Sequence, residues 1–316
     1  MILRLVSTQS EELRKRFVIK KDDAKKSVLN VSNFKSRYLN FTSKTFRDFN
    51  ELAEHANYDT YVVGSDLVWE PLLNNRETLP VYLLGFANQG CKVSYATSVG
   101  EWIPKWARSI FEEYLKKFDF ISVRDETSAK SLREFSAADI EVVLDPVSLL
   151  GKEEWARLLK PPEKKPRTPY VLIYDIRRFT EIQSEMKRIA REMEWNLVTY
   201  VPSKDSFSFY SFDPLEFLWL YENAHFVVSS SFHGTVFAVL FNKPFYAVSP
   251  GPHVFPYRVK DFLRKLCLED RFVENPRELE SLSFDEPNWS FVNTRLENER
   301  KRSLDFLKKA LEGVEK

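Results

Sequence analysis

The sequence has few of the residues on which redox and metal chemistry depend. Among its 316 residues there are 2 cysteines and 4 histidines. Cys91 and Cys267 show no CxxC spacing and no neighbouring histidine, so we expect two ordinary buried thiols in a protein of a reducing compartment. The histidines lie far apart in the sequence and no pair has zinc-ligand spacing, so no metal site is expected.

The chain also lacks a dominant charge and a long apolar run. Its 47 Lys and Arg residues nearly balance its 46 Asp and Glu residues, which excludes a general attraction to nucleic acid or to an anionic membrane. No segment approaches the roughly 18 apolar residues of a membrane span, and the apolar patch at the N-terminus is too short for a signal peptide. We therefore expect a cytoplasmic protein.

Three motifs of nucleotide and hydrolase chemistry are absent as well. Without GxGxxG, a nicotinamide or flavin cofactor is not expected, and without GxxxxGK[ST] there is no P-loop for ATP. The absence of a GxSxG nucleophile elbow weakens a hydrolase interpretation. The sequence thus indicates a protein without a resident cofactor.

Two runs of short β-rich segments alternating with amphipathic helical segments are present. The first run has expected strands at 60–64, 92–100, 118–125 and 140–146. The second has expected strands at 170–176, 196–202, 225–230 and 244–249. Such alternation is typical of parallel sheets. We predict an α/β protein with two Rossmann-like domains facing each other across a cleft.

The domain boundaries follow from composition. A stretch rich in proline and charge, KPPEKKPRTP, separates the two runs and is the expected linker, 160–169. The predicted domains are therefore 1–159 and 170–290. The remaining segment, 291–316, is expected to be a C-terminal helix that packs back on the first domain.

Polar residues gather where the expected strands end, and open parallel sheets bind their ligands at that edge. In the first run these residues are Gly64, Ser65, Asp66, Ser98, Arg124 and Asp145. In the second run they are Asp175, Ser203, Lys204, Ser229, Ser231, His233, Gly234, Thr235, Ser249 and Gly251. These two sets hold the candidate binding residues.

His233 is the first catalytic candidate. It lies in FVVSSSFHGTVFAVLFNKPFY (226–246), where an expected strand ends and a helix begins. The first turn of a helix offers unpaired amides and the positive end of the helix dipole, which suits a phosphate or carboxylate. Gly234 would let the ligand approach the backbone, and a histidine there could donate a proton. Alternatively, His233 caps the helix or fills a polar pocket.

Arg124 is the second catalytic candidate. It ends an apolar strand, so its guanidinium is expected at the edge of the sheet, and arginine grips planar anions through two parallel hydrogen bonds. The alternative is a structural ion pair with Asp125 or Glu126. Asp125 is also expected to cap the next helix.

For five other residues a structural role is one of the interpretations. Asp145 precedes a proline and is expected to start a turn. Trp69 either stacks on a sugar or packs in the core. His55 is expected on a helix surface and His225 at the start of a strand, whereas His253 lies in a loop rich in proline and glycine that is either a lid or a plain connection.

Six stretches occurring in order carry a resemblance to a known family. They are YDTYVVGSDLVWEP (58–71), VSYATSVG (93–100), FISVRDETSAKSL (120–132), VVLDPVSLL (142–150), NAHFVVSSSFHGTVFAVLFNKPF (223–245) and YRVKDFLRKLCLEDRF (257–272). Together they resemble the polysaccharide pyruvyl transferase family, which is similar in fold to glycosyltransferases of the two-Rossmann-domain (GT-B) type.

The resemblance implies an activity and a set of site residues. Characterised family members move a pyruvyl group from phosphoenolpyruvate to two hydroxyls of a sugar and form a ketal, so the implied partners are phosphoenolpyruvate and a saccharide of a cell-surface polysaccharide or its precursor. A lipid-linked acceptor would place the protein at the membrane surface. The resemblance assigns a catalytic or donor-binding role to His233, binding of the donor's anionic groups to Arg124, and a second positive charge to Arg258.

One departure from the family pattern concerns the start of the chain. Family members usually begin with a strand and a glycine-containing loop, whereas residues 1–40 contain no glycine. The first domain is therefore expected to lack the family's usual N-terminal segment, either because the true start lies upstream, or because another chain completes the site, or because the activity has changed. Two alternatives stay open, a GT-B glycosyltransferase using a nucleotide-sugar and a non-catalytic sugar-binding descendant.

Overall fold

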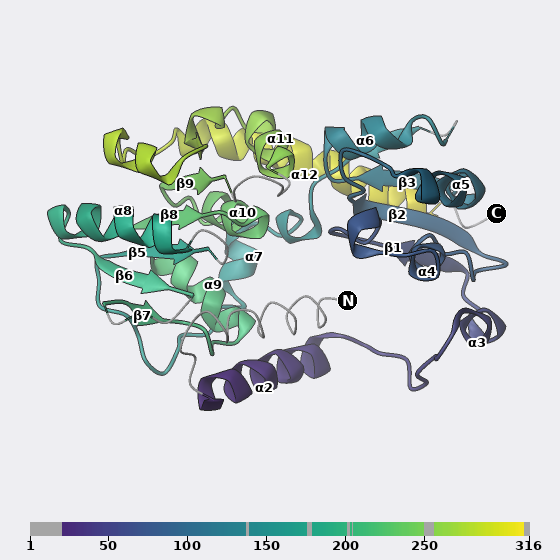
Figure 1. Ribbon diagram of the computed structural model, residues 1–316, viewed down its shortest axis with the longest axis horizontal. Coiled ribbons are helices and arrows are strands. Elements are labelled where there is room, and N and C mark those ends of the chain that lie inside the picture. Colours follow the sequence, from purple (N-terminus) through teal and green to yellow (C-terminus); the bar gives the residue numbers. More distant parts are fainter. Residues whose placement is uncertain are drawn as a thin grey trace. The chain divides into compact units, whose positions relative to one another are not determined.

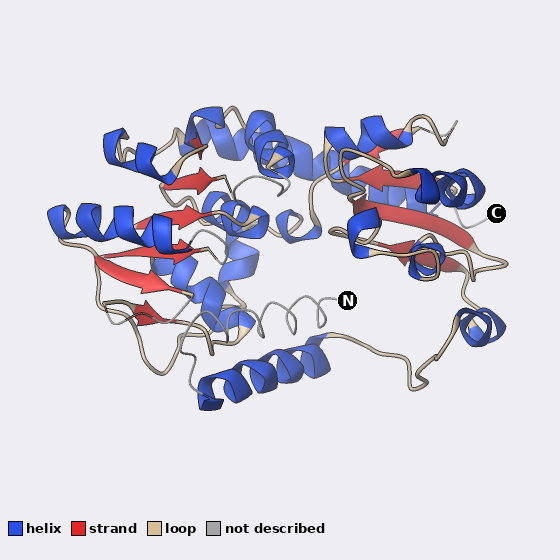
Figure 2. Ribbon diagram, viewed as in Figure 1, coloured by secondary structure: helices blue, strands red, loops and turns tan. Residues whose placement is uncertain are grey.

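The computed structural model describes residues 21–136, 139–175, 179–200, 203, 205–249 and 256–312. These residues form two compact units, each built on a parallel sheet with helices around it (Figures 1 and 2). The β1–β4 unit has its described residues within 42–150, 255–267 and 290–312. The β5–β10 unit has its described residues within 21–41, 151–254 and 268–289.

The sheet of the β1–β4 unit is parallel, in the order β1-β2-β3-β4 along the described chain. Its strands are β1 (Thr60–Val63), β2 (Cys91–Thr97), β3 (Phe120–Val123) and β4 (Ile140–Val142). The central strand β2 is buried on both faces after its first residue, as expected for a parallel sheet covered by helices on both sides. All four carboxyl ends therefore lie at one edge of this sheet.

Helices cover both faces of this sheet. They are α3 (Phe49–His55), α4 (Thr78–Tyr82), α5 (Lys105–Tyr114), α6 (Glu126–Leu132), α11 (Tyr257–Lys265) and α12 (Trp289–Glu312), with the 3-10 turns η1 (Pro71–Leu73), η2 (Leu115–Lys117) and η3 (Pro146–Ser148). The amphipathic helix α5 buries Ala107 and Phe111 in the core on one face. On the other face α12 packs Phe306 against Tyr95 and Phe120. α12 therefore contributes to the hydrophobic core of this unit.

The sheet of the β5–β10 unit is also parallel, in the order β10-β9-β8-β5-β6-β7 among the described strands. The strands are β5 (Tyr170–Tyr174), β6 (Asn196–Thr199), β7 (Phe207–Ser208), β8 (Phe226–Ser229), β9 (Phe245–Val248) and β10 (Phe272–Val273). Its helices are α2 (Lys21–Tyr38), α7 (Lys152–Ala156), α8 (Phe179–Glu192), α9 (Pro214–Asn223) and α10 (Phe232–Leu240), with η4 (Glu269–Arg271) and η5 (Pro276–Ser281).

The hydrophobic core of this unit follows the periodicity of α8. Ile182, Met186, Ile189 and Ala190 recur at helical spacing and are all buried against the sheet. Burial of each of the three larger side chains contributes about 1.5–3 kcal/mol, so this stripe fixes which face of α8 meets the sheet.

The compact units divide the chain differently from the expected domains. The expected linker, 160–169, is tied into the β5–β10 unit at its start, where Lys160 pairs with Asp213 at 2.8 Å. The preceding segment packs there too, with the Trp155 ring 5.7 Å from Phe237. The boundary at 159 therefore moves to 150, and α11 and nearly all of α12 return to the β1–β4 unit.

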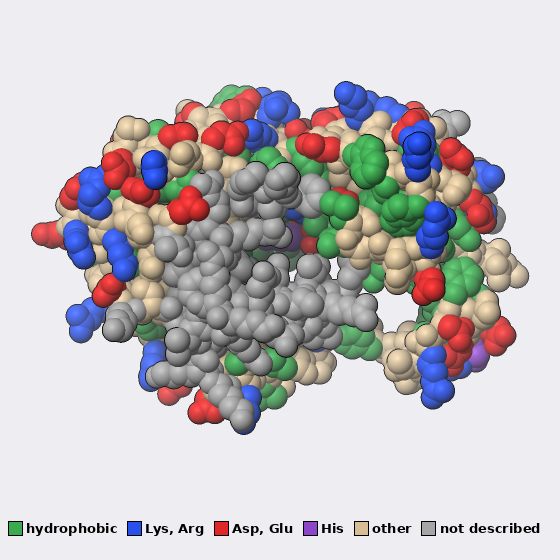
Figure 3. Space-filling view, in the orientation of Figure 1, with side chains coloured by type: hydrophobic (Ala, Val, Ile, Leu, Met, Phe, Trp, Pro, Cys, Tyr) green, Lys and Arg blue, Asp and Glu red, His purple; other side chains and the backbone are tan. Residues whose placement is uncertain are grey.

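Three findings bear on the expectations drawn from composition. The visible face carries Lys and Arg interspersed with Asp and Glu rather than segregated from them (Figure 3). No helix in the described part of the chain is long and apolar enough to cross a membrane. The expectation of two buried thiols is wrong, because Cys91 is half-buried and Cys267 is exposed just after α11.

Candidate functional site

The loop after β1 begins the candidate site of the β1–β4 unit. Gly64 has a φ of 146°, and a Cβ there would lie 1.9 Å from the carbonyl oxygen of Tyr95, so only glycine fits. Asp66 follows with a φ of 67°, and its carbonyl accepts a hydrogen bond from the Ser98 amide at 2.8 Å. The loop is thus held beside the end of β2.

Arg124, at the end of β3, contacts Asp66, Ser98 and Asp145, and these four residues are called the Arg124 cluster. Its Nη1 donates to Asp145 Oδ2 at 2.7 Å, its Nη2 to Asp66 Oδ1 at 2.8 Å, and its Nε to Ser98 Oγ at 3.3 Å. The side chains of Arg124 and Asp145 are 1% and 2% exposed, whereas that of Asp66 is 40% exposed. Burial opposes the charge of Arg124, but the two carboxylates outweigh it and raise the pKa of Arg124.

The carboxylates of Asp145 and Asp125 also cap local backbone structure. Asp145 caps the turn η3 by accepting from the Val147 amide at 3.2 Å, as expected for a turn start, and it also accepts from Ser65 Oγ at 3.2 Å. Asp125 caps α6, as predicted, and accepts from Ser98 Oγ at 2.6 Å. The ion pairs of Arg124 are thus formed with Asp66 and Asp145, and not with Asp125 or Glu126 as in the alternative drawn from the sequence.

Arg258 enters the same cluster from α11. Its Nη1 lies 3.5 Å from Asp66 Oδ1, so the Asp66 carboxylate stands between the guanidinium groups of Arg124 and Arg258. The Arg258 side chain is 13% exposed. Burial and then the charge of Arg124 lower the pKa of Arg258. Both guanidinium groups thus share one carboxylate, and the Arg258 contact is the longer of the two.

Glu70, in the loop after β1, is a buried acidic residue that the sequence analysis did not single out. It is 2% exposed and immediately follows Trp69, whose fully buried ring packs 5.4 Å from Phe118, so the packing interpretation of Trp69 is confirmed. Burial raises the pKa of Glu70 to about 7, although the hydrogen bond from the Leu72 amide and the charge of Arg258 lower it.

Replacing Glu70 by Gln is expected to flatten the pH dependence of stability. The unfolded carboxyl ionises near pH 4.5 and the folded one near pH 7, so the wild-type protein loses stability as the pH rises through this window. Glutamine cannot ionise and removes that loss. Thermal unfolding at pH 5 and pH 8 should show a smaller drop in Tm for Glu70→Gln than for the wild type. The exposed Glu77→Gln is the control, and parallel curves for all three proteins would contradict the expectation.

The second group of candidate residues lies at the start of α10 in the β5–β10 unit. Ser231 is the N-cap, and its Oγ accepts from the Gly234 amide at 3.4 Å, so His233 does not cap the helix. His233 is half-buried in the first turn, with its ring 5.4 Å from that of Phe232. Thr235 is buried and donates to the Ser231 carbonyl at 3.1 Å.

Gly234 has a packing reason for being glycine. A Cβ at this position would lie 2.2 Å from Ser229 Oγ and 2.9 Å from a ring carbon of Tyr174, so glycine lets α10 lie close to the ends of β8 and β5. At the same strand ends Ser230 donates a hydrogen bond to Asp175, which is 1% exposed. A rigid, polar strand edge therefore supports the first turn of α10.

The structure thus brings the predicted residues together in two groups. Gly64, Ser65, Asp66, Ser98, Arg124 and Arg258 cluster in the β1–β4 unit. Ser231, His233, Gly234 and Thr235 share one helical turn in the β5–β10 unit.

His55 and His225 lie outside these two groups. His55 is exposed at the end of α3 and lies 2.8 Å from Lys44 Nζ, and His225 is exposed just before β8, both as expected. Lys204, Gly251 and His253 lie outside the described residues. Within the described ranges no three His, Cys, Asp or Glu residues are grouped so that they could hold a metal ion.

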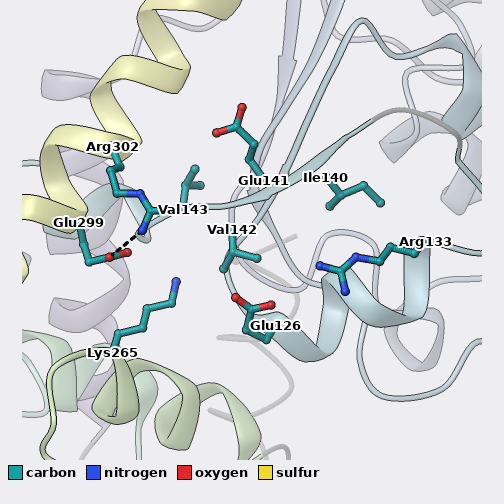
Figure 4. Close-up of a pocket in the computed structure, with 9 residues that line it drawn as sticks. All are labelled: Glu126, Arg133, Ile140, Glu141, Val142, Val143, Lys265, Glu299 and Arg302. Carbon is teal, nitrogen blue, oxygen red and sulfur yellow. Dashed lines mark hydrogen bonds and ion pairs between the residues drawn. The ribbon is translucent and has the colours of Figure 1, made fainter.

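A separate hollow of about 380 Å³ opens in the β1–β4 unit against β4, α6, α11 and α12 (Figure 4). Its charged lining residues are Arg133, Lys265, Arg302, Glu126, Glu141 and Glu299. Arg302 pairs with Glu299 at 3.2 Å, and burial lowers the pKa of Lys265. The three cationic and three acidic side chains of this hollow balance in charge.

Similar solved structures identify the class of fold. A putative UDP-N-acetylglucosamine 2-epimerase from Listeria monocytogenes has a similar structure, with a TM-score of 0.53 and 13% identity over 84% of this chain and 78% of that one. A UDP-GlcNAc 2-epimerase from Methanocaldococcus jannaschii gives a TM-score of 0.47 at 13% identity over 82% and 78% of the two chains. The fold is therefore of the GT-B type with two Rossmann-like domains, as predicted.

The family is given by a sequence model. The model described as polysaccharide pyruvyl transferase matches residues 9–252, which is most of the chain. The chain belongs to the polysaccharide pyruvyl transferase family, whose members are transferases of polysaccharide biosynthesis that use a pyruvate donor and a saccharide acceptor. The search of curated proteins gave no significant match.

Proposed function

We propose that this protein transfers a pyruvyl group from phosphoenolpyruvate to two hydroxyls of a saccharide, forming a ketal on a cell-surface polysaccharide or its precursor. The observation that carries the proposal is the pair of guanidinium groups, Arg124 and Arg258, at the carboxyl ends of a parallel sheet in a member of the pyruvyl transferase family. Phosphoenolpyruvate carries a phosphate and a carboxylate, and such groups are bound best by arginine.

The two arginines have different roles in this proposal. Arg124 is buried and held by Asp145 and Asp66, so it positions the loop after β1 and sets the charge of the cluster. Arg258 is more exposed and its contact with Asp66 is longer, at 3.5 Å. The anionic donor therefore binds at Arg258, with Asp66 as the internal carboxylate whose place it takes.

His233 handles the proton in this proposal. A proton must be added to the methylene carbon of phosphoenolpyruvate, and a hydroxyl oxygen of the sugar then attacks the neighbouring carbon. The bond from that carbon to the phosphate oxygen breaks, and the second hydroxyl completes the ketal. Of the two hydroxyl protons released, one balances the new methyl group and the other leaves with phosphate. A histidine in the first turn of a helix suits this exchange of a proton.

Replacing Arg258 by Gln is expected to weaken phosphoenolpyruvate binding by about 10- to 100-fold, because a hydrogen bond to a charged group contributes about 1.5–3 kcal/mol. Calorimetric titration with phosphoenolpyruvate, beside UDP-glucose, measures this. Arg264→Gln on the same helix is the matched control, since its side chain is 62% exposed and it pairs with Asp261. Heat from UDP-glucose with none from phosphoenolpyruvate would move the assignment to glycosyl transfer, and heat from neither would indicate a non-catalytic descendant.

A further inference from the structure

A short part of the β5–β10 unit carries positive charge without any negative charge. The stretch AKKSVLNVSNFKSRYLNF, residues 24–41, contains no Asp or Glu, although the whole chain has 46 of them. It covers most of α2 and the three residues that follow this helix. Its cations are Lys25, Lys26, Lys35 and Arg37. Because the charges of the whole chain nearly balance, this excess of positive charge is a property of one surface.

The same stretch exposes large apolar side chains. They are Val28, Leu29, Tyr38, Leu39 and Phe41. Val28 and Leu29 are each 59% exposed, and Phe41 is 68% exposed. Single exposed apolar residues are common on soluble proteins, whereas a group of them within residues 28–41 indicates an interaction surface.

Basic and apolar side chains share the outer face of α2, which lies at the outside of the β5–β10 unit (Figure 1). The inner face of α2 packs beside α9, where Asn30 Nδ2 donates to the Ser211 carbonyl at 2.8 Å. On the outer face Leu29 lies one helical turn after Lys25 and Lys26, and all three residues are exposed. Residues three and four apart are neighbours on a helix surface, so these side chains lie together.

The chain after α2 continues this surface. The Leu39 amide donates to the Lys35 carbonyl at 2.9 Å, which holds Leu39 one helical turn after Lys35. In the described part of the chain no acidic side chain pairs with any of the four cations, whereas the nearby Lys44 pairs with Glu51 at 3.2 Å. The four cations and the five apolar residues are together called the α2 patch.

We propose that the α2 patch binds the surface of an anionic lipid bilayer. The negative potential of such a surface attracts lysine and arginine, and exposed apolar side chains enter the boundary between headgroups and acyl chains. In this arrangement Lys25 and Lys26 lie at the headgroups, and Leu29 beside them enters the boundary. The proposal goes beyond the proposed function and does not depend on it, because the patch shares no residue with the candidate site.

Two other partners fit the α2 patch less well. A second copy of the chain, docked patch to patch, brings four cations against four cations, which repel each other. Nucleic acid attracts cations, but single strands are bound through aromatic stacking, whereas Val28, Leu29 and Leu39 are aliphatic. A lipid surface uses the cations and the aliphatic side chains together.

The test is co-sedimentation of the full chain with vesicles at about 0.1 M salt. Vesicles of phosphatidylcholine alone are compared with vesicles that contain about one third phosphatidylglycerol. We expect binding to the anionic vesicles that weakens as the salt is raised. Lys25→Gln/Lys26→Gln should weaken it about 25-fold, because each cation near the membrane contributes a factor of about five. Lys164→Gln/Lys165→Gln, which changes two neighbouring exposed lysines of the same unit, should bind as the wild type does.

A second variant tests the apolar part of the α2 patch. Leu29→Ser/Phe41→Ser should weaken binding to the anionic vesicles by at least about tenfold, because burial of such side chains is lost. The salt dependence should stay, since the four cations are kept. Absence of binding to the anionic vesicles, or binding by either patch variant that equals the wild type, would overturn the proposal.

The remaining outcomes identify the other partners. A dimer in solution that Leu29→Ser/Phe41→Ser abolishes, without vesicle binding, would assign the α2 patch to a second copy. Retention on single-stranded DNA, without vesicle binding, would assign it to nucleic acid. Either result would overturn the lipid proposal. Titration of the wild type with phosphoenolpyruvate is independent of these results, so failure of this proposal and failure of the proposed function are distinguishable.

Discussion

Replacing His233 by Gln is expected to slow pyruvyl transfer by about 100- to 10,000-fold while the protein stays folded, because general acid catalysis contributes rate factors of this size. Glutamine keeps hydrogen-bonding capacity but cannot deliver a proton near neutral pH. The cap of α10 does not depend on this side chain, since Ser231 provides it. The measurement is phosphate release from phosphoenolpyruvate in the presence of a saccharide acceptor.

The matched control for this substitution is His225→Gln. His225 lies in the same unit, is exposed, and contributes its backbone amide to the Tyr170 carbonyl at 3.0 Å, a bond that the substitution preserves. Its rate should equal that of the wild type. A His233→Gln protein that kept its rate within a factor of about three would remove His233 from the proton transfer, since the loss of a general acid is far larger.

Replacing Arg124 by Gln is expected to lower the free energy of unfolding by about 3–5 kcal/mol. The substitution leaves the carboxylate of Asp145, 2% exposed, without its cation, and deprives Asp66 of its shorter ion pair. Most proteins have a total stability of only about 5–15 kcal/mol, so the variant should unfold at a much lower urea concentration. Urea unfolding followed by fluorescence measures the change.

Arg108→Gln is the control for this experiment. Arg108 forms an ion pair with Glu134 at 2.9 Å in the same unit, but these side chains are 43% and 50% exposed. Exposed pairs of this kind contribute about 0–1 kcal/mol. Equal changes in the free energy of unfolding for both substitutions would contradict the claim that burial makes the ion pairs of Arg124 stabilising.

The sequence predicted the strands and their parallel pairing well. Helix-length spacers between short apolar segments require parallel neighbours, and the expected strands at 60–64 and 118–125 correspond to β1 and β3. The pairing order β10-β9-β8-β5-β6-β7 was out of reach, because sequence periodicity identifies a strand but not its neighbours. The same limit explains the wrong boundaries. The amphipathic pattern of α11 indicates that one face of the helix is buried. It does not indicate that the helix belongs to the β1–β4 unit.

The sequence predicted which residues of the candidate site follow the ends of strands. Residues that follow strands of one parallel sheet meet at one edge, which is why Asp66, Ser98 and Arg124 were foreseen and do touch. Their partners could not be chosen from the sequence. Arg124 passes over the adjacent Asp125 to reach Asp145, because Asp125 is turned towards the α6 amides. Glu70 was not predicted, because its raised pKa results from burial, and the burial of one acidic residue cannot be read from the sequence.

The most direct measurement of the central claim follows the donor's carbon. The full chain is incubated with carbon-13-labelled phosphoenolpyruvate and a panel of saccharides, and the saccharides are analysed by mass spectrometry before and after mild acid. We expect labelled carbon on an acceptor in equal amount to the phosphate released, removed by acid as a ketal would be, and absent with His233→Gln. Phosphate release without labelled saccharide, or labelled saccharide that resists acid, would contradict transfer of a pyruvyl ketal by this protein.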